Sequence, residues 1–143
     1  MKTKTVVIIA MLLLAAAGVY MHAGSGAECR RPELAAGYRG LVLELPPAQL
    51  AWVRKGDHLD VISVFDAIMK GEKKERIAAT LLQHVKVAGV NPRRGTVVLL
   101  VNPNEAQYAA LAKEQGPLSI ALRAAGDKQL AAIEIASYRK LIR

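Results

Sequence analysis

A run of fifteen residues without a charge, Val6 to Tyr20, constrains this chain more than any other feature. Lys2 and Lys4 precede the run, and the first acidic residue is Glu28. A basic start followed by an apolar stretch is typical of an export signal, and the positive-inside rule keeps such a start in the cytoplasm. We therefore expect the rest of the chain to lie outside the cytoplasm.

Two kinds of export signal fit the run. A cleaved signal peptide has an apolar stretch of about 7 to 15 residues and a small-residue cleavage site, which Ser25 to Ala27 provides. A membrane-spanning helix needs about 20 residues, which residues 5–23 supply. We favour the uncleaved anchor and interpret residues 1–23 as a signal anchor or signal peptide.

Cys29 is the only cysteine in the chain. A single cysteine excludes an intramolecular disulfide and any zinc or iron-sulfur site built from several cysteines. Glu28 stands where a lipoprotein has a small residue, so we expect no lipidation. A thiol without a function and an intermolecular disulfide both remain open.

The rest of the chain is long enough for one domain, because single cores are usually built from about 100 to 150 residues. Residues 24–38 combine small residues, charges and a proline without an apolar period, which is typical of a linker. We place the folded domain at residues 39–127 and a tail at residues 128–143. A loosely attached helix is the favoured structure of the tail, and a strand at residues 133–135 is the alternative.

Short apolar runs separated by turn residues predict five strands in the domain. They lie at residues 41–45, 59–65, 78–90, 96–101 and 118–123. Residues 96–101 form an uninterrupted apolar run, which is expected when both faces of a strand are buried.

Side-chain alternation predicts which faces of two strands are buried. In the third strand, Val85 and Val87 are expected on one face, with His84 and Lys86 on the other. In the last strand, the predicted inward residues are Leu118, Ile120 and Leu122, and the predicted outward residues are Ser119, Ala121 and Arg123. A single helical turn at residues 48–53 and a hydrophilic loop at residues 70–76 complete the interpretation.

One helix is strongly indicated, from about Pro103 to Gln115. Asn102 can cap it, proline suits the first helical position, and Glu105 stands three residues after the cap, which forms a capping box. Gly116 and Pro117 end it. Its expected apolar stripe is Ala106, Tyr108, Ala109, Leu111 and Ala112.

These elements define an α+β fold class: a small, mainly-β domain of about five strands with one helix before the last strand. A hydrophobic helix precedes the domain. Its core is expected to be aliphatic, since only 4% of the residues are aromatic.

Few patterns in this sequence indicate a catalytic site, a phosphate-binding loop or a metal site. None of the four serines stands in a nucleophile-elbow context, and no glycine-rich phosphate loop occurs. Asp57, His58 and Asp60 are the best metal-ligand candidates, but neighbouring strand residues point to opposite faces and zinc needs three or four ligands. We favour structural roles for all three and predict no catalytic residue, metal or cofactor.

The formal charge of +8 also has a bearing on partners. Residues 1–40 carry +3, from five basic and two acidic residues, and residues 41–143 carry +5, from fifteen and ten. An exported chain with scattered basic residues and few aromatic residues is not expected to meet nucleic acid. The basic residues favour binding to anionic lipid headgroups, to wall polymers or to an acidic protein partner. The alternative is a basic surface that contacts only solvent.

The order of several short motifs resembles a known family. They are Gly37-Tyr38-Arg39-Gly40, Lys55-Gly56-Asp57 with Asp60-Val61, Thr80-Leu81-Leu82 with Val85 and Val87, Thr96 to Val101 with Asn102 to Ala106, and Gly116, Leu118, Leu122-Arg123 and Asp127. Together they resemble the C-terminal domain of the Flp pilus assembly protein family called CpaB or RcpC. The match covers about residues 37–127, and the SAF-type β-clip domain that precedes this domain in the family is missing.

The resemblance implies a protein of the tight-adherence (Tad, type IVb) pilus machine, anchored by residues 5–23 in the bacterial inner membrane with its domain in the periplasm. Because the SAF-type domain is missing, a shortened paralogue and a component of a related secretion system are the alternatives. Its expected partners are the secretin or other pilus-assembly proteins, and its domain would belong to the β-clip/SAF neighbourhood. Motif residues read as fold-maintaining are Arg39, Gly56, Asp57, Asp60, Glu105, Arg123 and Asp127. We therefore expect an assembly factor that is not an enzyme; the alternative is a periplasmic module that binds glycan or peptidoglycan.

Overall fold

The computed structural model describes residues 31–69 and 73–138. The compact unit that these residues form begins at Pro32, seven residues before the predicted domain boundary. The predicted anchor at residues 5–23, Cys29 and the first part of the linker lie outside the described residues. Within the described ranges, no helix is both long enough and apolar enough to cross a bilayer.

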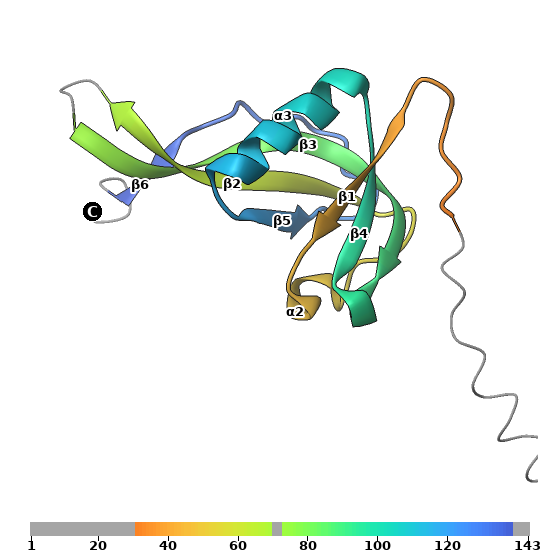
Figure 1. The fold of residues 1–143 in the computed structure, drawn as a ribbon. Coiled ribbons are helices and arrows are strands. Elements are labelled where there is room, and N and C mark those ends of the chain that lie inside the picture. The colour runs from red at the N-terminus through yellow and green to blue at the C-terminus, as the bar shows by residue number, and fades with distance from the viewer. Residues whose placement is uncertain (1–30, 70–72, 139–143) are drawn as a thin grey trace, which may run out of the picture. The chain divides into compact units, whose positions relative to one another are not determined.

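The part of the chain that the structure describes is mainly β and holds one antiparallel sheet of six strands (Figure 1). The strands are β1 (Arg39–Glu44), β2 (His58–Met69), β3 (Lys73–Asn91), β4 (Thr96–Val101), β5 (Leu118–Leu122) and β6 (Ala136–Ser137). Five of them follow the order β1-β4-β3-β2-β5, and β6 pairs with β3 away from that path. The helical elements are α2 (Pro47–Leu50), the 3-10 turn η1 (Pro92–Arg94) and α3 (Pro103–Gln115). The predicted class is confirmed at this level, and each of the five predicted strands is present.

The β2–β3 hairpin is longer than the sequence indicated. The loop predicted at residues 70–76 is wrong for residues 73–76, which begin β3 and pair with the end of β2. Lys74 Nζ lies 3.2 Å from Asp66 Oδ2 across the two strands, and both side chains are exposed. Charged residues are compatible with a strand here, because the strands pair through backbone hydrogen bonds. An antiparallel hairpin can also expose one face to water, where charged side chains remain solvated.

A β-bulge divides β3 into two halves. Opposite Asp60, β3 carries two residues, Gln83 and His84, because Leu59 pairs with Val85 and Val61 with Leu82. The extra residue has a left-handed backbone at His84, with φ of 56°, a conformation in which histidine is enriched among non-glycine residues. The bulge resets the alternation, so that Leu82 and Val85 are both buried.

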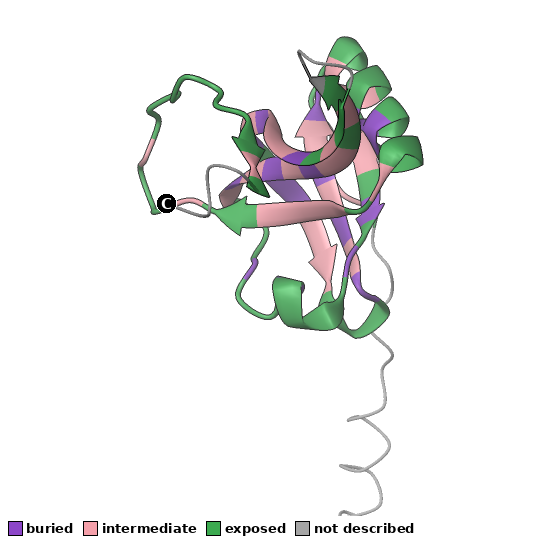
Figure 2. Ribbon diagram, turned by 90° about the vertical axis from the view of Figure 1, so that its left-hand side faces the viewer, coloured by how far each residue is buried: buried purple, intermediate pink, exposed green. Residues whose placement is uncertain are grey.

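The hydrophobic core is built largely by the strands of the curved sheet, and Figure 2 shows their buried positions in purple. Its members are Leu43, Leu45, Leu50, Val53, Leu59, Val61, Leu82, Val85, Val87, Val97, Leu99 and Val101, all within the compact unit. Val85 and Val87 are buried and Lys86 is exposed, as predicted. In β4, however, Val98 and Leu100 are only half-buried. The expectation that both faces of β4 are buried is therefore wrong, because full burial alternates along the strand and falls on Val97, Leu99 and Val101.

Helix α3 has the predicted bounds and the predicted capping box. The Asn102 side chain accepts from the Glu105 N–H at 2.9 Å, and Glu105 Oε2 accepts from the Asn102 N–H at 2.7 Å. Its apolar stripe is split, since Ala109 and Ala112 are buried whereas Tyr108 and Leu111 are more than 60% exposed. Small residues let the helix lie close to the sheet, which leaves the larger side chains on its flank.

Two predictions for the C-terminal part are wrong. Leu122 is 48% exposed rather than inward, and the side chain of Arg123 is 8% exposed rather than outward, because β5 ends at Leu122 and two carboxylates attract the guanidinium.

The tail helix does not form over residues 128–137, where irregular chain leads to β6. Gln83 holds the Ala131 backbone there by donating to its carbonyl at 2.9 Å and accepting from its N–H at 3.0 Å. These two hydrogen bonds require that the N–H and carbonyl of Ala131 are not bonded within a helix. Residues 139–143 lie outside the described part.

Candidate functional site

Three charged residues from two distant parts of the sequence form what we call the ion-pair cluster: Asp60, Arg123 and Asp127. Arg123 Nη1 donates to both carboxylate oxygens of Asp60, at 2.9 and 3.1 Å. Its Nη2 donates to Asp127 Oδ2 at 2.9 Å and to the backbone carbonyl of Gln129. The guanidinium therefore joins β2 to the turn that follows β5, across 63 sequence positions.

Backbone groups complete the cluster. The N–H of His84, the residue displaced by the bulge, donates to Asp60 Oδ1 at 2.8 Å. The N–H of Gln129 donates to Asp127 Oδ1 at 3.0 Å. This backbone bond, followed by the guanidinium of Arg123, holds the pKa of Asp127 below its usual value against the opposing effect of burial. Hydrogen bonding to Asp60 is the main cause that raises the pKa of Arg123.

Two histidines stack beside the cluster. The rings of His58 on β2 and His84 on β3 have centroids 4.2 Å apart and planes 10° apart. Partial burial is the main cause that lowers the pKa of His58, followed by the charges of His84, Lys86 and Arg123. Asp57 opposes these effects but does not cancel them. The imidazole of His58 therefore stays neutral at a pH where an ordinary histidine takes up a proton.

The other motif residues lie in local turns and caps. Asp57 Oδ2 accepts from the Arg54 N–H at 2.8 Å, Gly56 has a left-handed backbone at φ of 97°, and Glu105 caps α3. The Arg39 guanidinium donates to the neighbouring carbonyl of Tyr38. The structure thus brings Asp60, Arg123 and Asp127 together and leaves the other four motif residues apart.

The cluster offers little for catalysis. Each carboxylate already accepts from the guanidinium and from a backbone N–H, so neither is free to act as a base. Among the described residues, no group of three or more histidine, cysteine, aspartate or glutamate side chains is placed to hold a metal ion. The arrangement can cross-link the bulge, β5 and the tail, which is a structural role.

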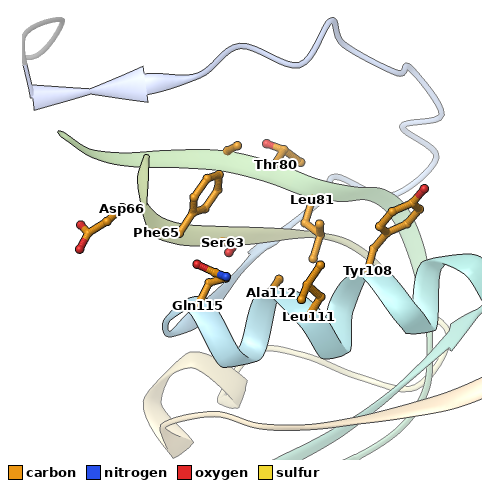
Figure 3. Close-up of a pocket in the computed structure, with 10 residues that line it drawn as sticks. Ser63, Phe65, Asp66, Thr80, Leu81, Tyr108, Leu111, Ala112 and Gln115 are labelled. Carbon is orange, nitrogen blue, oxygen red and sulfur yellow. The ribbon is translucent and has the colours of Figure 1, made fainter. Parts of the chain in front are cut away.

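A second feature is a groove between α3 and the β2–β3 hairpin, with a volume of about 500 Å³ (Figure 3). Its lining comes from three elements: Ser63, Phe65 and Asp66 on β2; Ala79, Thr80 and Leu81 on β3; and Tyr108, Leu111, Ala112 and Gln115 on α3. Leu81 and Leu111 point toward one another across it (Figure 3). Most of the lining surface is apolar, so the groove suits apolar side chains.

Ser63 lies at the groove but is only 2% exposed. Its Oγ has no hydrogen-bond partner among the described residues. A buried hydroxyl without a partner costs free energy, because it has lost its bonds to water. The floor of the groove is thus less stable than an apolar floor would be.

Sequence reasoning missed the groove and did not identify Asp60 as the ion-pair partner of Arg123. Tyr108 and Leu111 belong to the apolar stripe of α3. Side-chain size is the one sequence signal that distinguishes these exposed residues from the buried alanines of the stripe. The alternation places His84 with Lys86 on the face opposite Val85 and Val87, and only the bulge explains why the His84 N–H meets Asp60.

Comparisons of the chain with protein-family models, with curated proteins and with solved structures find no match.

Proposed function

We propose that this protein is an assembly factor of the bacterial envelope that acts through protein contacts and is not an enzyme. The single observation that carries the proposal is the groove beside α3, which leaves Tyr108 and Leu111 more than 60% exposed in an apolar setting. Exposed apolar residues gathered in one place mark sites of interaction. An apolar side chain from a partner protein is the occupant that this lining favours.

The finer identity rests on the resemblance to the CpaB or RcpC C-terminal domain. In this proposal, residues 5–23 anchor the chain in the inner membrane. The folded domain, which the resemblance places in the β-clip/SAF neighbourhood, lies in the periplasm. Its partners are the secretin or other components of a Flp/Tad-type pilus. The ion-pair cluster supports this proposal, because Asp60, Arg123 and Asp127 were read as fold-maintaining from the motifs and lie in one cross-link.

Site-specific crosslinking tests the proposal. A photoreactive amino acid is placed at Leu111 in the full chain, and the matched control carries it at Glu114, an exposed residue of α3 that does not line the groove. We expect adducts with a secretin or pilus component from Leu111 only. Equal labelling from both positions, or the absence of any envelope protein in the Leu111 adducts, would contradict it.

Variants separate docking from folding. Leu111→Asp places a charge in the groove and leaves the buried alanines of α3 unchanged, so we expect loss of pilus assembly with normal thermal stability. Glu114→Gln is the matched control. If Leu111→Asp retains pilus assembly, the groove is not the docking site and the proposal fails. If the domain sediments with purified peptidoglycan, the glycan-binding alternative is favoured.

A further inference from the structure

One end of the domain combines the only tryptophan of the chain with four cations. The segment from α2 to the start of β2 carries Trp52, Arg54 and Lys55, and η1 carries Arg93 and Arg94. The two segments lie side by side in both views (Figures 1 and 2). A backbone bond from the Leu45 N–H to the Gly95 carbonyl, at 2.8 Å, joins them. We call this surface the basic end.

The charges of the basic end are not neutralised within the described residues. All four cations are exposed, and none forms an ion pair there. Two acidic residues lie nearby in sequence, Glu44 and Asp57. Asp57 Oδ2 accepts from the Arg54 N–H and so serves the turn. The surface keeps a positive excess that complements an anionic partner.

Trp52 is 79% exposed, although Leu50, two residues before it, and Val53, directly after it, pack inward. Leu50 is fully buried and Val53 is 5% exposed, and the Val53 N–H donates to the Leu50 carbonyl at 3.1 Å. These contacts fix the backbone and hold the indole outside the core. Tryptophan surrounded by basic residues is typical of surfaces that sit at the boundary between water and lipid headgroups.

The chain enters the domain close to the basic end. Pro32 lies over Gly89 of β3, where a Cβ on the glycine would be 3.5 Å from the proline side chain. Gly89 is three residues from the start of η1 at Pro92. Only residues 24–31 separate Pro32 from the apolar segment, and an extended chain of that length reaches about 30 Å at most.

From these observations we propose that the basic end docks on anionic phospholipid headgroups of the membrane that residues 5–23 enter. Trp52 inserts at the headgroup level, and the four cations contact lipid phosphates. The inference rests on the membrane anchor of the proposed function and adds a second attachment. That attachment orients the domain on the bilayer and leaves α3 to face its protein partner.

Trp52 is a built-in probe of this contact, because no other tryptophan contributes to the fluorescence. The full chain is reconstituted into nanodiscs of phosphatidylcholine, either alone or mixed with phosphatidylglycerol. In anionic discs we expect a blue shift of the emission and quenching by brominated lipid, and both effects should be weak in neutral discs. High salt should reverse them, because it screens exposed charges.

Variants assign the effect to the basic end. Arg93→Gln with Arg94→Gln should abolish the blue shift, whereas the matched pair Lys113→Gln with Lys128→Gln, which removes two exposed cations elsewhere, should retain it. The proposal is overturned if the emission is the same in both lipid compositions or if the two pairs behave alike. It is also overturned if Trp52 responds to peptidoglycan fragments and not to lipid.

Failure of the anchor can be distinguished from failure of docking. Flotation with neutral discs reports on residues 5–23 alone. If the chain does not float, residues 5–23 are not a membrane anchor. Docking of the basic end is then tested with the compact unit from Pro32 on vesicles containing phosphatidylglycerol. There each arginine removed should weaken partitioning about fivefold, and equal binding by the arginine pair and the control pair would refute docking.

Discussion

Gly116, the C-cap of α3, lies close against β2, and replacing it by alanine should be severely destabilising. Its backbone is extended, with φ of 169°, so alanine meets no conformational barrier there. A Cβ would nevertheless lie 2.2 Å from the Val64 carbonyl oxygen, where 3.0 Å is the closest approach that such atoms make. The helix end or β2 must therefore move by at least about 0.8 Å.

Such a movement is resisted on both sides. Val64 pairs with Ala78 of β3, and the Gly116 N–H donates to the Ala112 carbonyl at 3.2 Å. Forcing extra volume into packed structure costs about 1 to 3 kcal/mol, and a clash with a backbone atom belongs at the upper end. We expect Gly116→Ala to lower the free energy of unfolding by about 3 kcal/mol, and the melting temperature of a domain of this size by more than about 10 °C.

Two other glycines provide matched controls. Gly126 has φ of 81° and open space around its missing Cβ, so alanine there should cost only about 1 kcal/mol for the left-handed backbone. Gly89 lies in β3 with 3.5 Å to Pro32, so alanine should be neutral or stabilise by about 0.5 kcal/mol. Urea denaturation of the compact unit from Pro32 measures all three. If Gly116→Ala is no worse than Gly126→Ala, the close approach of α3 to β2 is wrong.

Three further predictions concern the cap, the groove and pH. Asn102→Ala should lower the free energy of unfolding by about 1 kcal/mol, while Asn102→Asp should retain most of it; equal midpoints for the two variants in urea would show that the cap contributes nothing. Ser63→Ala should raise stability by about 1 kcal/mol, because it removes a buried hydroxyl without a partner, and a lower melting temperature would mean that the hydroxyl is bonded. The lowered pKa of His58 means that the unfolded chain takes up a proton below about pH 6.5 while the folded chain does so only at lower pH. Stability should therefore fall as pH drops from about 6.5 through the folded-state pKa, and His58→Gln should flatten that part of the profile in denaturation curves recorded at several pH values; an unchanged slope would contradict it.

Local signals in the sequence were sufficient for α3 and for the presence of the five longer strands. The capping box and Pro103 fix the start of α3 because a helix terminus must satisfy its own backbone N–H groups, and the residues that do so are neighbours in the chain. The same holds for the turn at Gly56 and Asp57. Strand length in the hairpin was underestimated because polar residues such as Lys73 and Lys74 pair through their backbones once β2 lies beside them.

The candidate sites depended on contacts that no local signal carries. The sequence by itself determined a mainly-β domain with one capped helix, since periodicity and turn chemistry act over a few residues. Tertiary structure decided that Arg123 turns inward to meet Asp60, because only folding brings two charges together across 63 positions. It also decided which apolar residues of α3 stay exposed, because the close approach of small alanines to the sheet leaves no room beneath the helix for Tyr108 and Leu111.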